Sequence, residues 1–492
     1  MKKILFNRNR LFLLLVVLLA AALRLFKLGS QVIWVDEAWT IVNAKLPIPV
    51  LVKMVASVDF HPPLYYIFLH YWIKIFGSGP LAARLPSLLF DLGGLLAVYR
   101  LGTSLGKPGE EKKTGLTAAL LYAVSAFLIM AAQEARMYPM LNFFLLSSLW
   151  YFYRALTQNR FKDWACFTLF LTAAAYTHYI TFHILTAFIL GYFLLLAFRQ
   201  VKTRSFPAFS ASIFSLFILY LPWAGIFADR FFNRRQIDPN WPIGELVLNA
   251  LHSLEMGTVS HYGNCFQDWF WILILLICPL AGIISLLKEP VKLVPALLFL
   301  VYPLGISVLL PLLTGKQTFN PAHLITSAGI LFLFWGLGSA ALLRIPVLRI
   351  LPYPLLFVFL CFNGVTLCNW DFNSYFQREN WEPIVRTIEK MEKPGDVVLV
   401  QTGHRVFPFR YNFKGRTPVI PADNLEKLPS DALFEKKRVW LVENCSDVTD
   451  PEFSLRNFLM QNGKPVFYFR EDNFASTGMI EIRLYKIPEL SQ

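Results

Sequence analysis

Two adjacent carboxylates, Asp36 and Glu37, are the residues of this chain best suited to acid–base chemistry. They lie between Trp34 and Trp39, shortly after the first long apolar run, Leu11 to Leu28. With a helical rise of about 1.5 Å per residue, that run is long enough to cross a hydrocarbon core of about 30 Å. We therefore expect the pair at a membrane face, where negative charge is costly and usually has a function.

The two carboxylates would point about 100° apart on a helix, so they cannot form a face-to-face dyad. One is the candidate general base, and the other orients it or binds an acceptor group. We assign the base to Asp36, because it follows an expected extended segment, 32–35, and would project toward the mouth of the first helix. The alternative is that both charges only stabilise the first turn of an interfacial helix through its dipole.

Two further motifs could bind an anionic substrate. His61 stands before two prolines, and its imidazole could hydrogen-bond a phosphate or a sugar hydroxyl. The short segment Gln133–Tyr138, which ends in a candidate binding tyrosine, contains Glu134 and Arg136, and arginine presents a planar fork that suits phosphate oxygens. The alternatives are an ordinary turn at the histidine and an ion pair of Glu134 with Arg136.

Three more residues extend this set. Arg84 is expected at the outer start of a helix and is a second phosphate candidate, with plain snorkelling as the alternative. His178 and Tyr179 end another apolar run, where a structural role at the interface is the alternative. No HxxxH or HExxH pair occurs, so the sequence indicates no metal site, and we expect no cofactor.

The composition shows what must hold these residues in place. The chain is 56% hydrophobic and only 16% charged, against about 25% charged in soluble proteins, so a polytopic α-helical membrane protein is expected. The net charge of +14 resides mainly in short loops between apolar runs, where lysine and arginine orient the chain and meet anionic membrane lipids. No basic stripe interleaved with aromatic residues occurs in a polar region, so no nucleic-acid partner is expected.

Apolar runs long enough to span a membrane number about eleven. They lie near residues 11–28, 80–103, 115–132, 139–155, 164–180, 182–198, 207–228, 268–287, 294–313, 323–343 and 350–369. The N-terminal run has no small-residue cleavage site before Asp36, so we interpret it as a retained signal-anchor helix.

The stretch His61–Phe76 is apolar but short. Whether it spans the membrane is decided by the side on which the basic loops then fall. If it lies in the outer interface, the basic loops all share the side of the N-terminus, as the positive-inside rule favours. Those loops are 107–113, 154–162, 199–204, 288–292 and 344–349. The N-terminus is then cytoplasmic, and every candidate site residue falls at the outer face.

After about residue 370 the composition turns polar and predicts a small extracytoplasmic α/β domain. We expect helices at 382–392 and 451–463 and strands at 396–400, 438–442, 464–469 and 479–485. The chain thus divides into a transmembrane catalytic domain, 1–369, and this domain, 370–492. Cys265 and Cys445 lie in polar segments of one predicted side, so a disulfide between them is possible.

The order of the motifs resembles that of one family, the bacterial GT-C glycosyltransferases of the family 39 type. The segments that carry the resemblance are Asp36-Glu37, His61-Pro62-Pro63-Leu64-Tyr65, Arg84-Leu85-Pro86-Ser87, Gln133-Glu134-Ala135-Arg136-Met137-Tyr138, Thr177-His178-Tyr179, and Asn380-Trp381 through Pro394-Gly395-Asp396-Val397-Val398. The chain is similar to protein O-mannosyltransferases and to the lipid A aminoarabinose transferase over nearly its whole length. One departure is that the family's late Arg-Tyr pair is replaced by a stretch from Lys316 to His323. Either Lys316 or His323 takes over a phosphate contact, or donor binding differs from that of the family.

The resemblance implies transfer of a sugar from a polyprenyl-phosphate donor to a lipid, glycan or protein hydroxyl, with inversion at the outer membrane face. Asp36 would take the acceptor proton, while Arg136, with Arg84 or Lys316, would stabilise the departing phosphate. A lipid-linked saccharide flippase is the alternative, but it would place polar residues near the bilayer midplane and often shows internal repeats. A third reading, an assembly factor that docks a partner through its outer domain, makes the acidic pair dispensable.

Overall fold

The computed structural model describes most of the chain, which forms two compact units. The described residues are 2–233, 243–257, 269–314, 321–373, 376–401, 403–422, 438–444, 450, 452–471 and 479–488. The helical unit comprises Met1–Leu28, Pro47–Ile75 and Ala82–Cys368, and the sheet unit comprises Gly29–Leu46, Phe76–Leu81 and Asn369–Gln492. The sheet unit therefore includes two segments that lie far from the C-terminus in sequence.

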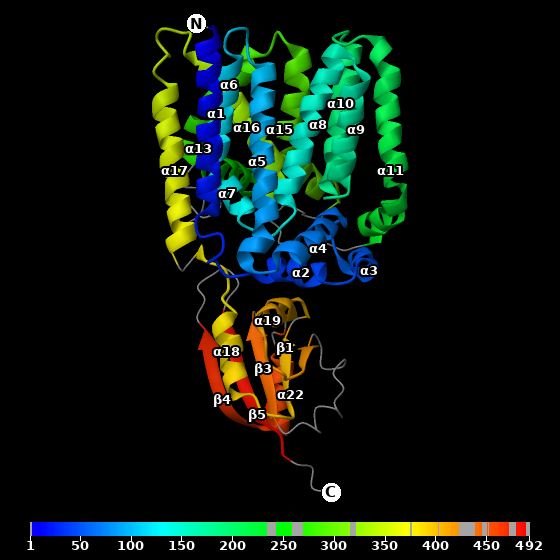
Figure 1. Ribbon diagram of the computed structural model, residues 1–492, viewed down its shortest axis with the longest axis vertical. Coiled ribbons are helices and arrows are strands. Elements are labelled where there is room, and N and C mark those ends of the chain that lie inside the picture. The colour runs from blue at the N-terminus through cyan, green and yellow to red at the C-terminus, as the bar shows by residue number, and fades with distance from the viewer. Residues whose placement is uncertain are drawn as a thin grey trace. The chain divides into compact units, whose positions relative to one another are not determined.

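The helical unit is a bundle of apolar helices (Figure 1). They are α1 (Lys2–Leu25), α3 (Ile48–Val58), α4 (Leu64–Phe76), α5 (Pro80–Leu105), α6 (Glu111–Val124), α7 (Ala126–Ala132), α8 (Tyr138–Gln158), α9 (Phe161–Ala175), α10 (Ile180–Ala197), α11 (Phe206–Asn233), α12 (Ile243–Met256), α13 (Trp269–Leu275), α14 (Ile277–Ser285), α15 (Pro290–Thr314), α16 (Ile325–Leu342) and α17 (Pro352–Phe372). Every predicted apolar run overlaps at least one of them, which confirms the helical membrane fold expected from the composition.

Within the described residues, five helical segments are long and apolar enough to cross a membrane by themselves. They are Pro80–Leu105, Ile180–Ala197, Thr203–Phe232, Ala322–Leu342 and Pro352–Phe372. The predicted run 115–132 is a sixth candidate, but it is bent by 62° between α6 and α7. The predicted helix in His61–Phe76 is α4, and it is not among the spanning candidates.

The bend between α6 and α7 exposes backbone groups that a straight helix would pair internally. Arg24 of α1 donates to the freed carbonyl groups of Ala123 (2.8 Å) and Tyr122 (3.3 Å). On the other side of the break, the N–H of Ala126 donates to Oδ1 of Asn363 (2.7 Å), which comes from α17. Because an apolar surrounding offers no water, side chains from distant helices must supply these partners.

A buried polar network joins four helices at this bend. Arg24 pairs with Asp91 of α5, and both side chains are fully buried. Asp91 also accepts a hydrogen bond from the hydroxyl of Tyr122 (2.9 Å), which in turn accepts one from Asn142 of α8 (2.9 Å). A buried charge pair is tolerated only with such additional hydrogen bonds, so this network ties α1, α5, α6 and α8 together.

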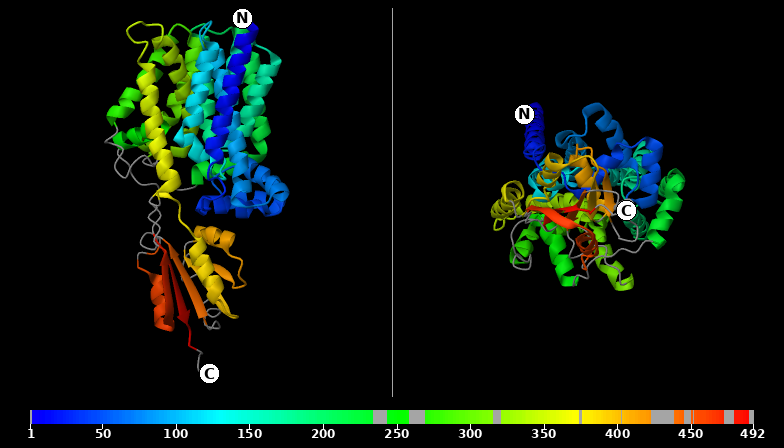
Figure 2. Two further views of the ribbon diagram at one scale, coloured as in Figure 1. Left: turned by 60° about the vertical axis from the view of Figure 1, so that its left-hand side comes forward. Right: turned by 90° about the horizontal axis from the view of Figure 1, so that it is seen from below.

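The predicted basic loops gather at the end of the bundle where the chain begins (Figures 1 and 2). An ion pair between Arg344 and Glu110 (2.8 Å) joins the loop after α16 to the one after α5. At the opposite end of the bundle, α3 and α4 lie across the other helices (Figure 1). This arrangement matches the shared sidedness of basic loops in the sequence, whereas the orientation of either end toward the cytoplasm stays a prediction.

The sheet unit contains a five-stranded sheet of order β2-β1-β3-β5-β4. Its strands are β1 (Asp396–Gln401), β2 (Val419–Ala422), β3 (Arg438–Asn444), β4 (Lys464–Glu471) and β5 (Ile480–Lys486). Strands β2, β1 and β3 run parallel, whereas β5 and β4 are antiparallel to their neighbours. The predicted α/β domain is confirmed, with α18 (Glu382–Met391) and α22 (Ser454–Asn462) near their expected positions; β2 and α19 (Val406–Asn412) were not expected.

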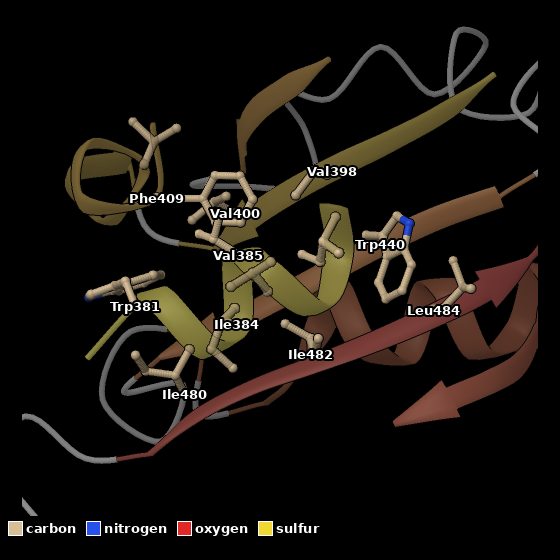
Figure 3. Close-up of a cluster of buried hydrophobic side chains, with 13 residues drawn as sticks. Trp381, Ile384, Val385, Val398, Val400, Phe409, Trp440, Ile480, Ile482 and Leu484 are labelled. Carbon is tan, nitrogen blue, oxygen red and sulfur yellow. The ribbon is translucent and has the colours of Figure 1, made fainter. Parts of the chain in front are cut away.

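Both faces of the sheet are covered. On one face Val398 and Val400 of β1 pack with Trp440 and with residues of α18 and α19 (Figure 3). On the other face Val397 and Leu399 pack with residues of α22. Because successive side chains of a strand point to opposite faces, the continuous apolar run of β1 fits a strand that is buried on both sides.

The remaining helix of the sheet unit is α2 (Val35–Ala44), which carries the acidic pair. The predicted disulfide partners, Cys265 and Cys445, both lie outside the described residues.

Candidate active site

The acidic pair lies in the first turn of α2. Trp34 has extended backbone angles and caps the helix, which begins at Val35. The prediction that residues 32–35 are extended is therefore wrong at Val35, and Asp36 is the second residue of the helix. Both carboxylates lie where the helix dipole favours negative charge. Glu37 is fully buried, whereas Asp36 is half-buried.

In the helical unit, His61 is held by an aspartate that precedes it. The carboxylate of Asp59, which is 4% exposed, accepts hydrogen bonds from the backbone N–H of His61 (2.8 Å) and from its Nδ1 (2.9 Å). The hydroxyl of Tyr66, one turn into α4, donates to the second carboxylate oxygen (2.6 Å). These contacts fix the ring of His61 and leave Nε2 as the ring nitrogen on the side away from the carboxylate.

Three histidines from distant parts of the chain lie in a row. The ring of His61 is 5.0 Å from that of His178, and the ring of His178 is 5.1 Å from that of His323, measured between centroids. The ring of Tyr138 lies 5.8 Å from His178. His178 lies in the turn between α9 and α10, and His323 lies in the short 3₁₀ turn Pro321–Leu324 before α16.

His178 has a ring N–H group that forms no hydrogen bond with the described residues. Its Nδ1 accepts a hydrogen bond from the backbone N–H of Ile180 (3.1 Å), which assigns the ring proton of the neutral imidazole to Nε2. Burial lowers the pKa of His178 well below its usual value, and the nearby His61, His323 and Arg136 lower it further. The ring is thus neutral, and its buried Nε2–H has no partner among the described residues. An oxygen of a bound substrate would satisfy it.

The segment that carries Arg136 is joined to helix α5, which carries Arg84, by one serine. Ser87, one turn after Arg84 in α5, donates to the carbonyl oxygen of Arg136 (2.9 Å) and bonds the hydroxyl of Tyr65 (2.9 Å). The guanidinium of Arg136, whose side chain is 5% exposed, lies 6.0 Å from the ring centroid of Tyr138. These contacts link the segment Gln133–Tyr138 to the start of α5.

Arg84 does not reach out to solvent. Its side chain is only 1% exposed, and Nη1 donates to the carbonyl oxygen of Leu28 (2.8 Å) in the turn that follows α1. The geometry therefore differs from the snorkelling alternative, in which the charged head would reach water.

The other candidates have mixed outcomes. Glu134 is half-buried in the same turn as Arg136, where its carbonyl oxygen accepts from the backbone N–H of Arg136 (2.8 Å). The hydroxyl of Tyr179 accepts a hydrogen bond from Trp223 of α11 (3.1 Å). Lys316 lies outside the described residues, so of the two proposed replacements for the missing Arg-Tyr pair, only His323 is seen within the row.

Two contacts of this cluster were missed by sequence reasoning. Arg230, near the end of α11, donates through Nε to the carbonyl oxygen of Asp59 (3.1 Å), although it lies beyond the predicted apolar run 207–228. Asp59 is visible in the sequence just before the His61 motif but was given no role there, although an acid two residues before a histidine is well placed to hold its ring. Within the described ranges, no group of three or more His, Cys, Asp or Glu is arranged to hold a metal ion.

The helical unit contributes imidazole and guanidinium groups, which suit phosphate oxygens, and the sheet unit carries the carboxylates Asp36 and Glu37, which suit proton abstraction. We call His61, Arg84, Arg136, His178 and His323 the donor cluster, after the N–H groups of Arg84, Arg136 and His178.

Comparison with known proteins tests the class that this chemistry suggests. Residues 60–224 match the model of the family described as dolichyl-phosphate-mannose-protein mannosyltransferase. A search among curated proteins gave no match.

Solved structures match over nearly the whole chain. ArnT from Cupriavidus metallidurans in the apo state matches with a TM-score of 0.62 and 12% identity, over 96% of this chain and 97% of that chain. The same protein bound to undecaprenyl phosphate matches with a TM-score of 0.61 and 12% identity, over 98% of both chains. The oligosaccharyltransferase AglB from Archaeoglobus fulgidus matches with a TM-score of 0.56 and 12% identity, over 98% of this chain and 74% of that chain.

At such identities the structural matches establish the fold, and the family match adds the class of enzyme. The fold is that of the GT-C glycosyltransferases, and together with the family match it confirms the membrane glycosyltransferase predicted from the sequence.

Proposed function

We propose that this protein transfers a sugar from a polyprenyl-phosphate donor to an acceptor hydroxyl at the outer face of the cytoplasmic membrane. The observation that carries the proposal is the buried Nε2–H of His178, which points to an oxygen-bearing ligand and lies beside Arg136 and two more histidines. A lipid phosphate supplies several such oxygens. Support also comes from the matching fold of ArnT, a protein whose structure holds undecaprenyl phosphate.

The proposed mechanism is a single displacement with inversion. Asp36 takes the proton from the acceptor hydroxyl as its oxygen attacks the anomeric carbon, and the bond from that carbon to the phosphate oxygen breaks. Arg136 and Arg84, with the Nε2–H of His178, stabilise the negative charge that develops on the departing phosphate. Glu37 orients Asp36 or binds the acceptor, and Glu134, Tyr138 and Tyr179 line the substrate.

Lys316 retains its proposed role as a further phosphate contact. The acceptor is a lipid, a glycan or a protein hydroxyl, and no metal or cofactor enters any step.

The test compares the envelope lipids and glycans of a strain that lacks the gene with those of the same strain carrying it. The proposal predicts one species that loses the mass of a single sugar, and its restoration by the wild-type gene. Purified protein added to the deficient membranes should release polyprenyl phosphate as the sugar is transferred. Accumulation of the intact donor on one side of the membrane, without any release, would instead indicate the transporter.

The face of the membrane is tested by cysteine labelling. In a protein without native cysteines, Lys113→Cys should react only with reagents that enter the cytoplasm, and Lys414→Cys should react from outside. Both positions are at exposed side chains. Labelling of both from the same side would refute the proposed orientation.

A further inference from the structure

The helix that carries the acidic pair is packed on the C-terminal domain, inside one compact unit. Helix α2 packs against α19 and against the 3₁₀ turn Gly403–Arg405. The ring of Trp39 lies 4.5 Å from that of Phe407, the second residue of α19. Because Trp39 is three residues after Asp36, both side chains lie on neighbouring parts of the helix surface.

Both ends of α2 are held by the same domain. At its start, the guanidinium of Arg378 lies 4.0 Å from the ring centroid of Trp34 and 5.4 Å from that of Trp370. Trp34 is the residue that caps α2, two positions before Asp36. At its end, the ammonium of Lys45 lies 5.9 Å from the ring centroid of Tyr411.

These anchors are themselves rigidly supported. Phe407 packs against the core that α18 and α19 form on the sheet. Arg405, in the turn that touches α2, forms an ion pair with the fully buried Glu379 (2.7 Å), the residue after Arg378. The position of α2 is thus linked through Phe407 to the sheet, and through Arg378 to the segment that leads into the domain.

We propose that the C-terminal domain is a positioning element for the catalytic carboxylates, with Phe407 and Arg378 as its positioning residues. This inference rests on the proposed function, in which Asp36 acts as the base. A displacement of a reacting group by about 1 Å can cost on the order of 10²-fold in rate. Loss of either anchor therefore slows the transfer step, whereas binding of the lipid phosphate by the donor cluster does not depend on it.

The test uses the full-length protein in detergent or nanodiscs, with membranes of the gene-deficient strain as the source of donor and acceptor. Release of polyprenyl phosphate gives the rate, and undecaprenyl phosphate serves as the probe of binding. Phe407→Ala should lower the maximal rate about 10–100-fold and leave the affinity for undecaprenyl phosphate unchanged. Phe407→Tyr should restore most of the rate, because it keeps the aromatic ring against Trp39.

A matched control separates positioning from stability of the domain. Phe467 is also half-buried against the same core but lies on β4, away from the turn that touches α2. Phe467→Ala should therefore keep a nearly wild-type rate per folded molecule. Should Phe407→Ala prevent folding, Arg378→Ala tests the other anchor, with the exposed Arg386→Ala as its control.

The pH dependence of the rate gives a readout that a purely structural role would not change. If Phe407→Ala moves Asp36 from its place, the acidic limb of the pH–rate profile should shift in that variant. The profile of Phe467→Ala should match that of the wild type. Equal losses in the two alanine variants, or a loss that follows the affinity for undecaprenyl phosphate, would overturn the inference. If Asp36→Asn and Glu37→Gln both keep full activity, the proposed function fails; if Asp36→Asn abolishes activity and the anchor variants do not reduce it, only this inference fails.

Discussion

The acidic helix α2 and the donor cluster offer a substrate opposite kinds of groups. Helix α2 carries Asp36 and Glu37, which accept protons and repel phosphate. The donor cluster carries guanidinium groups and the Nε2–H of His178, which are hydrogen-bond donors suited to phosphate oxygens and are not strong bases. The two sets belong to different compact units of the chain. Proton removal and leaving-group stabilisation are therefore assigned to separate regions, and substitutions should affect them separately.

The largest effect is expected at the acidic helix. Asp36→Asn should lower the rate of transfer by about 10²–10⁴-fold, the typical loss of a positioned general base. Binding of undecaprenyl phosphate, measured with purified protein, should be unchanged, because a carboxylate does not attract a phosphate. Glu37→Gln should be milder or should alter the affinity for the acceptor. Normal turnover of the Asp36 variant in the release assay would refute its role.

The next effect is expected at Arg136. Arg136→Ala should weaken binding of undecaprenyl phosphate by about 10–100-fold, because a hydrogen bond to a charged group contributes about 1.5–3 kcal/mol. Lysine should restore only part of the affinity, since a point charge does not reproduce the planar fork. Unchanged affinity in the alanine variant would mean that Arg136 serves the structure of its turn and not the donor.

A smaller effect is expected from pH at His178. Its folded-state pKa lies below the usual value, so above about 6.5 the folded and unfolded states are both neutral there and no stability is lost. As the pH falls below about 6.5, the unfolded chain binds a proton that the folded protein does not, and stability decreases. The melting temperature should therefore fall less between pH 7.5 and pH 5.5 for His178→Asn than for the wild type. His404→Asn, at an exposed site, is the control and should leave the slope unchanged.

The smallest effect on substrate binding is expected from the buried pair of Arg24 and Asp91, near the bend between α6 and α7. Asp91→Asn leaves Arg24 buried without its carboxylate, which should cost about 3–5 kcal/mol in stability. Per folded molecule, however, the affinity for undecaprenyl phosphate should match that of the wild type. A selective loss of phosphate binding, at unchanged melting temperature, would assign this pair to the substrate and blur the contrast between the two regions.

The sequence by itself determined the class of the protein and most of its elements. Continuous apolar runs have one stable solution in a membrane, the helix, because its backbone satisfies its own hydrogen bonds. Most strands and helices after residue 370 also followed from their local patterns, but β2 and α19 did not. The motif at 133–138 pointed to the family now supported by fold and by the match over residues 60–224.

Only the tertiary structure decided what lies beside what. The bend at Ser125 depends on Arg24 and Asn363, which reach the broken backbone from other helices and leave no local signal in the run 115–132. The row of three histidines joins residues more than a hundred positions apart, so no spacing in the sequence could reveal it.

The placement of the acidic pair gives the same lesson. From sequence, Asp36 and Glu37 belong to the exit of the first helix, because they follow it along the chain. In the structure, Trp34 and Trp39 on either side of them are held by Arg378 and Phe407, and so their helix belongs to the sheet unit. A helix as short as residues 35–44 is only marginally stable by itself, so burial of its aromatic side chains against a domain distant in sequence decides where that helix is held.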